Sequence, residues 1–294
     1  MAHNDLLVRP LSAVRPDEEP LLGGKAVNLA SALRAGLPVP NGIALPFPLA
    51  DAIAADEHGV LASARQVLAE ALELGGGVAV RSSAVGEDGA SASFAGQHLT
   101  VLGLDSVDAV LDAIRKVRAS ASAPSALAYR ARLGVKGEVR VGVVIQQLVD
   151  AECAGVLFTR NPVTGADERV IEAAWGLGES VVSGLVVPDR YRVARDGRVL
   201  ECTPGLKDVA LRPRSSSDGG GTEEATVDDK LARALCLDEA RLARLHTLAE
   251  RCEAIFGGAH DLEWAFTARP RDELFLLQRR AITTLAPRDS RGTT

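Results

Sequence analysis

Residues 260–265, H-D-L-E-W-A, and residues 276–280, L-L-Q-R-R, are the two stretches that decide the fold of this chain. Their composition predicts two strands joined by a polar turn at residues 268–272. Residues i and i+2 of a strand share a face. Asp261 and Glu263 therefore point to one side, and the apolar residues that alternate with them point to the other.

The second strand carries a matching pair of polar residues. Gln278 and Arg280 share a face, and a turn centred near residue 270 brings them roughly opposite Asp261 and Glu263. Two carboxylates, an amide and a guanidinium form a costly cover for an apolar core. They suit a platform for Mg²⁺ and phosphate, because hard cations take oxygen ligands and arginine binds phosphate through paired hydrogen bonds. The alternative interpretation is the solvated face of an edge hairpin.

Composition limits the classes of protein to which the chain can belong. Its 294 residues, 47% of them hydrophobic, are enough for a sizeable core in one large domain or two lobes. A net charge of −6 argues against a general nucleic-acid-binding surface, and 3% aromatic residues argue against stacking platforms for single strands. Four cysteines without a C-x-x-C pair indicate buried thiols rather than a zinc site or a disulfide framework. Without a signal core or a membrane-length apolar run, we expect a cytoplasmic protein with no membrane partner.

Periodicity and turn residues predict helices and strands interspersed with hairpins, which indicates an α+β fold rather than a pure βαβ sheet. We expect helices over residues 23–36, 48–74 and 107–133, the last broken at 120–125. A clear helix follows Asp238, with an apolar face formed by Leu242, Leu245, Leu248, Cys252 and Ile255. Strands are expected at 78–80, 139–149, 155–158 and 170–174, with a hairpin over 191–200. The composition of residues 84–97 predicts a mobile loop, and that of 213–226 a surface loop.

Gly23-Gly24-Lys25, at the start of the first expected helix, is a candidate phosphate site. It is not a P-loop, because Glu19 and Ala26 occupy positions where the Walker pattern needs a glycine and a Ser or Thr. Helix N-termini nevertheless attract anions, glycine allows their close approach, and Lys25 adds a positive charge. The alternative is an ordinary glycine-rich helix start with a surface lysine.

Two further candidates lie at the ends of expected strands. Arg81 comes directly after the strand at 78–80, and a small-residue loop at 91–97 is suited to close over a substrate. Residues 143–149 form an apolar strand that ends in amides and offers an apolar wall and backbone groups to an adenine ring. The alternatives are a surface arginine beside a flexible connection and a core strand with exposed glutamines.

Taken together, these segments resemble the nucleotide-binding domain of the pyruvate phosphate dikinase, phosphoenolpyruvate synthase and rifampin phosphotransferase family. The likeness covers nearly the whole chain, and the matching motifs occur in the order of the family. They are L-G-G-K-A-V-N-L at 22–29, V-A-V-R-S-S-A at 78–84, S-F-A-G-Q at 93–97, G-V-L-F-T-R-N-P-V-T-G at 155–165, W-G-L-G-E-S-V-V-S-G at 175–184, V-P-D at 187–189, D-L-E-W-A at 261–265 and L-Q-R-R at 277–280.

The resemblance implies an ATP-grasp-like fold that holds ATP between two lobes, residues 1–145 and residues 146–294, the second carrying the metal and phosphate platform. It also implies roles for individual residues. Lys25 and Arg81 would bind the ATP phosphates and act in catalysis, and Asp261 and Glu263 would hold Mg²⁺. Gln278 and Arg280 would complete the phosphate end, with Arg280 stabilising charge during transfer. The adenine edge would comprise Gln146, Gln147, Leu148 and Val149, Glu179 would contact the ribose or the metal, and residues 91–97 would close over the site.

In this family ATP is converted to AMP, phosphate and a phosphohistidine on a separate swivelling domain. None of the five histidines here lies in a matching context, and we expect structural roles for His98 and His260 and a solvated His246. The resemblance thus implies a phosphotransferase component that passes a phosphoryl group to a separate histidine-bearing phosphocarrier protein and then to a small-molecule acceptor. The alternatives are a direct small-molecule kinase or ligase, an excised fragment of a longer enzyme, and a non-catalytic ATP-sensing module.

Overall fold

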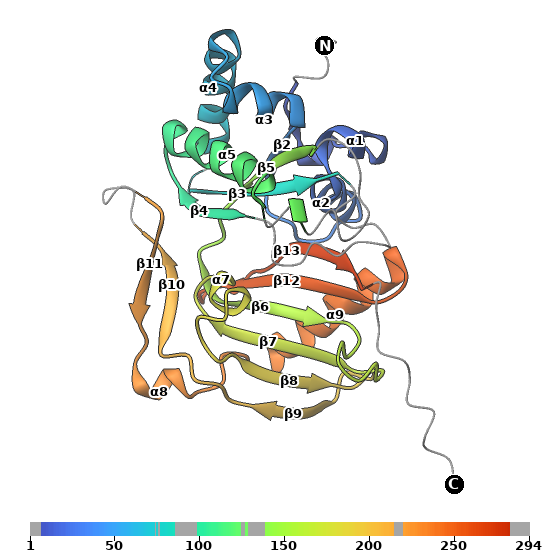
Figure 1. Cartoon of the computed structure of the whole chain (residues 1–294). Coiled ribbons are helices and arrows are strands. Elements are labelled where there is room, and N and C mark those ends of the chain that lie inside the picture. The colour runs from blue at the N-terminus through green and yellow to red at the C-terminus, as the bar shows by residue number, and fades with distance from the viewer. Residues whose placement is uncertain are drawn as a thin grey trace. The chain divides into compact units, whose positions relative to one another are not determined.

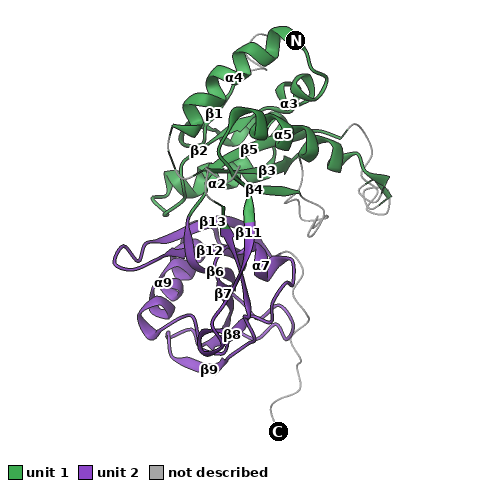
Figure 2. Ribbon diagram, turned by 90° about the vertical axis from the view of Figure 1, so that its left-hand side faces the viewer, with its two compact units in different colours: residues 1–149, 213–222 green, residues 150–212, 223–294 purple. Residues whose placement is uncertain are grey.

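The computed structural model describes residues 7–73, 75, 77–85, 99–124, 127–128, 139–214 and 220–282. The chain forms two compact units: unit 1 comprises Met1–Val149 and Pro213–Thr222, and unit 2 comprises Asp150–Arg212 and Glu223–Thr294 (Figure 2). Each unit contains an antiparallel sheet and helices, so the predicted α+β class is confirmed. The lobe boundary expected after residue 145 falls inside a strand, Val141–Gln147, and unit 1 continues to Val149.

Unit 1 is built on a five-stranded sheet with the order β1-β2-β5-β3-β4 (Figure 1). All of its neighbouring strands are antiparallel. The strands are β1 (Arg9–Pro10), β2 (Gly42–Leu45), β3 (Val78–Ala84), β4 (Thr100–Leu104) and β5 (Val141–Gln147). The described helices are α1 (Glu19–Leu22), α2 (Gly24–Arg34), α3 (Phe47–Ala54), α4 (His58–Leu72) and α5 (Val107–Ala121), with 3₁₀ turns at Leu11–Ala13 and Pro16–Glu18.

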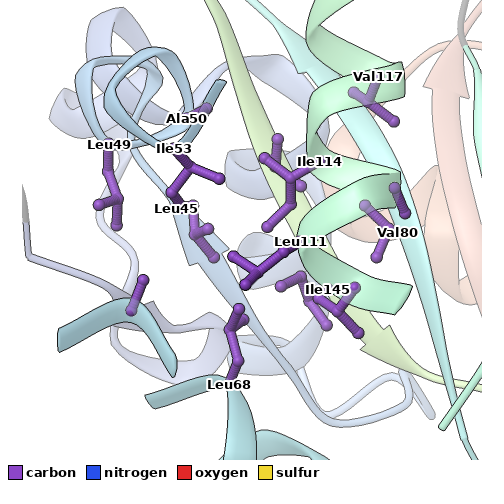
Figure 3. Packing of buried hydrophobic residues seen from close by; sticks show 14 of the residues in the cluster. Leu45, Leu49, Ala50, Ile53, Leu68, Val80, Leu111, Ile114, Val117 and Ile145 are labelled. Carbon is purple, nitrogen blue, oxygen red and sulfur yellow. The ribbon is translucent and has the colours of Figure 1, made fainter. Parts of the chain in front are cut away.

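The core of unit 1 lies between helices α3, α4 and α5 and strands β2, β3 and β5. Apolar residues recur along α5 at helical spacing and are buried against the sheet. Ser106 caps the start of the helix by accepting a 3.3 Å hydrogen bond from the Ala109 N–H. Figure 3 shows the resulting packing, in which the labelled side chains are Leu45, Leu49, Ala50, Ile53, Leu68, Val80, Leu111, Ile114, Val117 and Ile145. Burying each large aliphatic side chain contributes roughly 1.5–3 kcal/mol, so this cluster holds the β3–β5 pair in place.

The helix expected over residues 48–74 is in fact two helices. α3 ends at Ala54 and α4 begins at His58. Asp56 between them has a φ of 55°, which is incompatible with a continuing right-handed helix. The break expected at residues 120–125 is confirmed, since α5 ends at Ala121. Most of the segment between α5 and residue 139, namely residues 125–126 and 129–138, lies outside the described residues.

Unit 2 is built on a six-stranded antiparallel sheet with the order β13-β12-β6-β7-β8-β9 (Figure 1). Its strands are β6 (Ala151–Phe158), β7 (Arg169–Trp175), β8 (Asp189–Val193), β9 (Val199–Thr203), β12 (His260–Thr267) and β13 (Leu274–Ala281). The helices are α7 (Glu179–Val182), α8 (Asp229–Ala232) and α9 (Glu239–Phe256). A separate two-stranded sheet consists of β10 (Val209–Pro213) and β11 (Thr222–Thr226).

Helix α9 packs on β12 and is the helix predicted after Asp238. Asp238 caps it as expected, accepting a 2.9 Å hydrogen bond from the Arg241 N–H. The predicted apolar face is correct except at Ile255, which is 44% exposed. With about 3.6 residues per turn, Phe256 continues the stripe better than Ile255, and its ring stacks on the Arg279 guanidinium at 3.9 Å.

The two expected loops have different outcomes. Residues 86–98, which include most of the loop predicted at 84–97, lie outside the described residues. The prediction of a loop over residues 213–226 is wrong for Thr222–Thr226, which form β11. The Gly221 N–H donates to Gly103 O at 2.6 Å, and this contact within unit 1 fixes the chain at the start of β11. No helix in the described part of the chain has the length and apolarity needed to cross a membrane.

Candidate functional site

The hairpin β12–β13 carries the polar platform, which we define as Asp261, Glu263, Gln278 and Arg280. Asp261 lies opposite Arg280, and Glu263 lies opposite Gln278. The turn between the strands is closed by a 3.2 Å hydrogen bond from the Asp272 N–H to the Ala268 O. The predicted strands, their turn and the pairing of the four polar residues are therefore confirmed.

β12 holds its side chains firmly because it is paired on both edges, with β13 and with β6 (Figure 1). The faces of the strand alternate as predicted. Leu262 and Trp264 are fully buried, whereas Asp261 and Glu263 are half-buried on the other face. The fold thus uses one side of this strand for the core and the other for the platform.

The surroundings of Asp261 are unfavourable for a carboxylate. Its Oδ1 is buried and has no hydrogen-bond partner among the described residues. Burial is the main reason why the pKa of Asp261 rises from 3.8 to about 6; the charge of Glu263 adds to the rise and Arg280 opposes it. A cation beside Oδ1 would stabilise the ionised form.

These residues fit Mg²⁺. Asp261 and Glu263 present two carboxylates, the hard oxygen donors that Mg²⁺ prefers, on one face of one strand. Mg²⁺ is commonly bound by one or two carboxylates and completes its shell with water and substrate phosphates. The buried Oδ1 of Asp261 supplies the structural reason for a cation, and the donor set suits one that is bound together with a nucleotide.

Gln278 and Arg280 complete the platform from β13. Gln278 is 4% exposed, and Arg280 is half-buried. The positive charge of Arg280 acts on Asp261 across the strand pair, where it lowers the pKa of that carboxyl. The platform therefore places a cationic group beside an acidic pair, which suits an anion with a bound metal.

Two more acidic residues lie in this part of unit 2. Glu179 is the first residue of α7, which packs on β6 and β7. The sequence did not single out Glu172 of β7. Val156 of β6 pairs with Glu263 on one side and with Glu172 on the other, and directly paired residues point to the same face. The period-two alternation of side chains along a strand over residues 169–175 could have pointed to Glu172.

In unit 1, α2 begins at Gly24, so the predicted helix start is confirmed. Lys25 is 4% exposed, which makes it a buried residue rather than a surface lysine. The Ala26 N–H donates to Ser83 Oγ at 3.1 Å, which ties the start of α2 to β3. Ser83 was not predicted, because a contact between residues so far apart in sequence leaves no local pattern.

Arg81 lies inside β3 rather than directly after it. The strand expected at 78–80 continues to Ala84, because Arg81 to Ala84 pair with residues 144 to 141 of β5. Arg81 is 8% exposed, and its Nη1 donates to Gln146 Oε1 at 3.4 Å. Hydrogen bonds accommodate this buried polar segment, since Arg81 donates to Gln146 and Ser83 accepts from the Ala26 N–H.

The four residues proposed for the adenine edge have different surroundings. Gln146 is buried, and its side chain also donates to Pro40 O at 3.4 Å, so it supports Arg81. The Gln147 and Leu148 N–H groups donate to Asn41 O and Gly77 O at 2.8 and 3.1 Å. Val149 is 9% exposed and ends unit 1 in this part of the chain.

The histidines differ from one another. His260 is 1% exposed, its N–H donates to Thr159 Oγ1 at 2.9 Å, and burial lowers its pKa. This agrees with the structural role expected for it. The solvated position expected for His246 is wrong, because its ring contacts Arg169 and lies 3.4 Å from Glu250. His98 and the closing loop at 91–97 lie outside the described residues.

Comparison with known proteins decides the family. The family described as "Pyruvate phosphate dikinase, AMP/ATP-binding domain" matches residues 49–293. The chain belongs to this family. The dikinase-family domain is 40% identical over 210 residues to a probable phosphoenolpyruvate synthase of Methanothermobacter thermautotrophicus, covering 71% of this chain and 30% of that protein. The resemblance inferred from the motifs is therefore confirmed.

Other relatives extend the comparison. A probable phosphoenolpyruvate synthase of Archaeoglobus fulgidus is 33% identical over 94% of this dikinase-family chain and 41% of its own. The rifampicin phosphotransferase of Bacillus subtilis is 38% identical over 71% of this chain and 24% of its own. The chain spans less than half the length of these relatives.

Matches to solved structures are weaker. N5-carboxyaminoimidazole synthase from Aspergillus clavatus, in complex with ADP and 5-aminoimidazole ribonucleotide, matches with a TM-score of 0.40 and 10% identity, over 92% of this chain and 46% of that one. The ATP-grasp ligase PsnB matches with a TM-score of 0.33 and 12% identity, over 96% of this chain and 58% of that one.

Proposed function

We propose that this domain binds Mg²⁺ and ATP and acts as the ATP-dependent component of a phosphotransferase of the dikinase type. The observation that carries the proposal is the register of β12 and β13, which sets Asp261 opposite Arg280 and Glu263 opposite Gln278. Membership of an AMP/ATP-binding family supports the nucleotide. The buried Oδ1 of Asp261 supports the metal.

The proposal gives each part of the platform a task. Asp261 and Glu263 hold Mg²⁺, which when bound neutralises charge on the triphosphate. Gln278 donates its amide to a phosphate oxygen. Arg280 binds the same end of the nucleotide and stabilises charge that develops during transfer, the largest contribution in most phosphoryl-transfer sites.

Residues outside the platform also bind the nucleotide. Lys25 and Arg81 bind the phosphates, and both are buried side chains held on regular elements. The segment from Gln146 to Val149 forms the adenine edge. Glu179 of unit 2 contacts the ribose or the metal.

The wider reaction is also part of the proposal. ATP is converted to AMP as one of its two terminal phosphoryl groups passes to water, giving phosphate, and the other passes to a histidine on a separate protein and from there to a small-molecule acceptor. The relatives named phosphoenolpyruvate synthase and rifampicin phosphotransferase support a phosphoryl transfer. We place the reaction in the cytoplasm, which accords with four cysteines that remain thiols.

Calorimetric titration with ATP, in Mg²⁺ and in EDTA, tests the site. Wild-type protein should bind ATP, and EDTA should weaken binding. Glu263→Gln should lower turnover about 100-fold or more without unfolding the protein. Glu224→Gln, the same change at an exposed position of β11, is the matched control. Turnover unchanged in Glu263→Gln would remove the platform from the active site.

Product analysis separates the proposed reaction from its alternatives. AMP and phosphate, formed when a histidine-bearing protein is supplied, support the dikinase reaction. ADP formed with a small acceptor would instead identify a direct kinase or ligase. Binding of Mg·ATP without turnover under both conditions would identify an ATP-sensing module.

A further inference from the structure

Helix α2 is capped by a residue from a different element. Its N-cap position is Gly23, and no side chain at that position caps the helix. The N–H of Ala26, the third helical residue, donates instead to Ser83 Oγ of β3 at 3.1 Å. A serine or threonine at the N-cap normally accepts this hydrogen bond. Here the acceptor is 57 residues away in sequence.

Glycine at position 23 is what permits this contact. Gly23 has a φ of +80°, which side chains rarely tolerate. A Cβ at Gly23 would lie 2.0 Å from Ser83 O and 2.6 Å from Ser83 Oγ. The backbone of Gly23 therefore lies directly against Ser83. Ser83 is fully buried, so water has no access to replace its hydroxyl.

The contact links the segments that carry two buried cations of unit 1. Lys25 immediately precedes Ala26 in α2, and Arg81 lies two residues before Ser83 on β3. Residues two apart on a strand share a face, so Arg81 and Ser83 project to the same side of β3. The hydroxyl of Ser83 thus fixes the backbone of the Lys25 turn relative to the strand that carries Arg81.

We propose that Ser83 is a positioning residue for Lys25, whose hydroxyl holds the first turn of α2 so that Lys25 and Arg81 act on the same phosphate groups. The inference rests on the proposed function, which assigns both cations to ATP. Loss of the hydroxyl leaves the Ala26 N–H without its acceptor and loosens the turn. The consequence is confined to the phosphate end of the ligand, since Lys25 has no part in binding adenine.

The test is calorimetric titration of the full chain with Mg·ATP and, separately, with AMP. Ser83→Ala should weaken Mg·ATP binding about fivefold or more, the equivalent of losing one helix cap, and should change AMP binding less than about twofold. Ser106→Ala is the matched control, because it removes the same kind of bond, 3.3 Å from the Ala109 N–H, at α5 of the same unit. It should lower stability by a similar amount and leave Mg·ATP affinity unchanged.

Lys25→Met completes the design. If Ser83 acts through Lys25, the double variant Ser83→Ala/Lys25→Met should bind Mg·ATP no more weakly than Lys25→Met alone. Additive losses would overturn the inference, and so would equal losses for Mg·ATP and AMP in Ser83→Ala. Should Ser83→Ala not fold, Ser83→Cys keeps the shape of the side chain with a slightly larger atom, supplies a weak acceptor and allows the same comparison.

The phosphate role of Lys25 and the positioning role of Ser83 can be refuted separately. If Lys25→Met leaves Mg·ATP affinity unchanged, the phosphate role of Lys25 under the proposed function is wrong. If Lys25→Met weakens Mg·ATP binding but Ser83→Ala does not, only the positioning role of Ser83 is overturned.

Discussion

Asp261→Asn should stabilise the protein at neutral pH while it impairs metal binding. The ionised Asp261 carboxylate is held in a buried setting beside Glu263, and its Oδ1 has no partner among the described residues. An asparagine has nearly the same shape and carries no charge at any pH. The substitution therefore removes an electrostatic penalty that the wild-type protein accepts at its platform.

The magnitude follows from the pKa of Asp261, which rises from 3.8 to about 6 on folding. A tenfold difference in proton affinity corresponds to about 1.4 kcal/mol, so a roughly hundredfold difference corresponds to about 3 kcal/mol. The folded protein binds this proton more tightly than the unfolded chain does. The stabilisation by the proton is thus fully present below about pH 4 and is lost as the pH rises through about 6.

The assay is urea unfolding of both proteins at several pH values between 4 and 7.5, followed by tryptophan fluorescence. Both tryptophans, Trp175 and Trp264, lie in unit 2, so the signal reports on the unit that contains Asp261. The free energy of unfolding of Asp261→Asn minus that of wild type should rise by about 2.5 kcal/mol from pH 4 to pH 7, because the unfolded carboxyl is already partly ionised at pH 4. Effects of the substitution that do not depend on pH cancel in this comparison.

Glu224→Gln serves as the control, because it removes a carboxylate from an exposed position. The difference in free energy of unfolding between Glu224→Gln and wild type should vary by less than about 0.5 kcal/mol over the same pH range. If the difference in free energy of unfolding between Asp261→Asn and wild type stayed constant or fell as the pH rises, the desolvated state of Asp261 would be refuted. Saturating Mg·ATP should raise the stability of wild type much more than that of Asp261→Asn.

Two further predictions concern stability. Gly23→Ala should destabilise the protein by more than about 2 kcal/mol, because it combines a φ of +80° with a Cβ placed 2.0 Å from Ser83 O; a normal urea midpoint would contradict this. Lys207→Met should cost about 3–5 kcal/mol, because Lys207 and Asp189 form a fully buried 2.5 Å ion pair and the carboxylate would lose its cation. Thermal unfolding should show the loss, and Lys230→Met, at an exposed position of α8, should stay within about 0.5 kcal/mol of wild type.

The features that the sequence predicted correctly are those encoded locally. The hairpin follows from the alternation in residues 260–265 and from the turn residues that follow. The apolar stripe and cap of α9 follow in the same way from Asp238 and the residues after it. Each of these patterns lies within a few residues of the structure that it specifies.

The features that the sequence did not predict depend on distant parts of the chain. The mostly polar residues Arg81 to Ala84 argue against a continuing strand, yet they extend β3 because they pair with β5 and are buried. The hydrogen bond from Arg81 to the Gln146 side chain, between residues 65 positions apart, was likewise not predicted. Ser83 completes a helix cap from another element. Only the tertiary fold brings such partners together.

The alternation along β12 also governs how this domain can diverge. Unless it were absorbed by a β-bulge, as at the register shifts after Glu263 and Phe266, a one-residue insertion or deletion within the strand would reverse the faces of the residues beyond it. We therefore expect changes in length to be tolerated better in the turn at residues 268–272 than between Asp261 and Glu263. Evolution and protein engineering can alter the chemistry of the platform by substitution, while the spacing of its residues stays fixed by the requirement to fold.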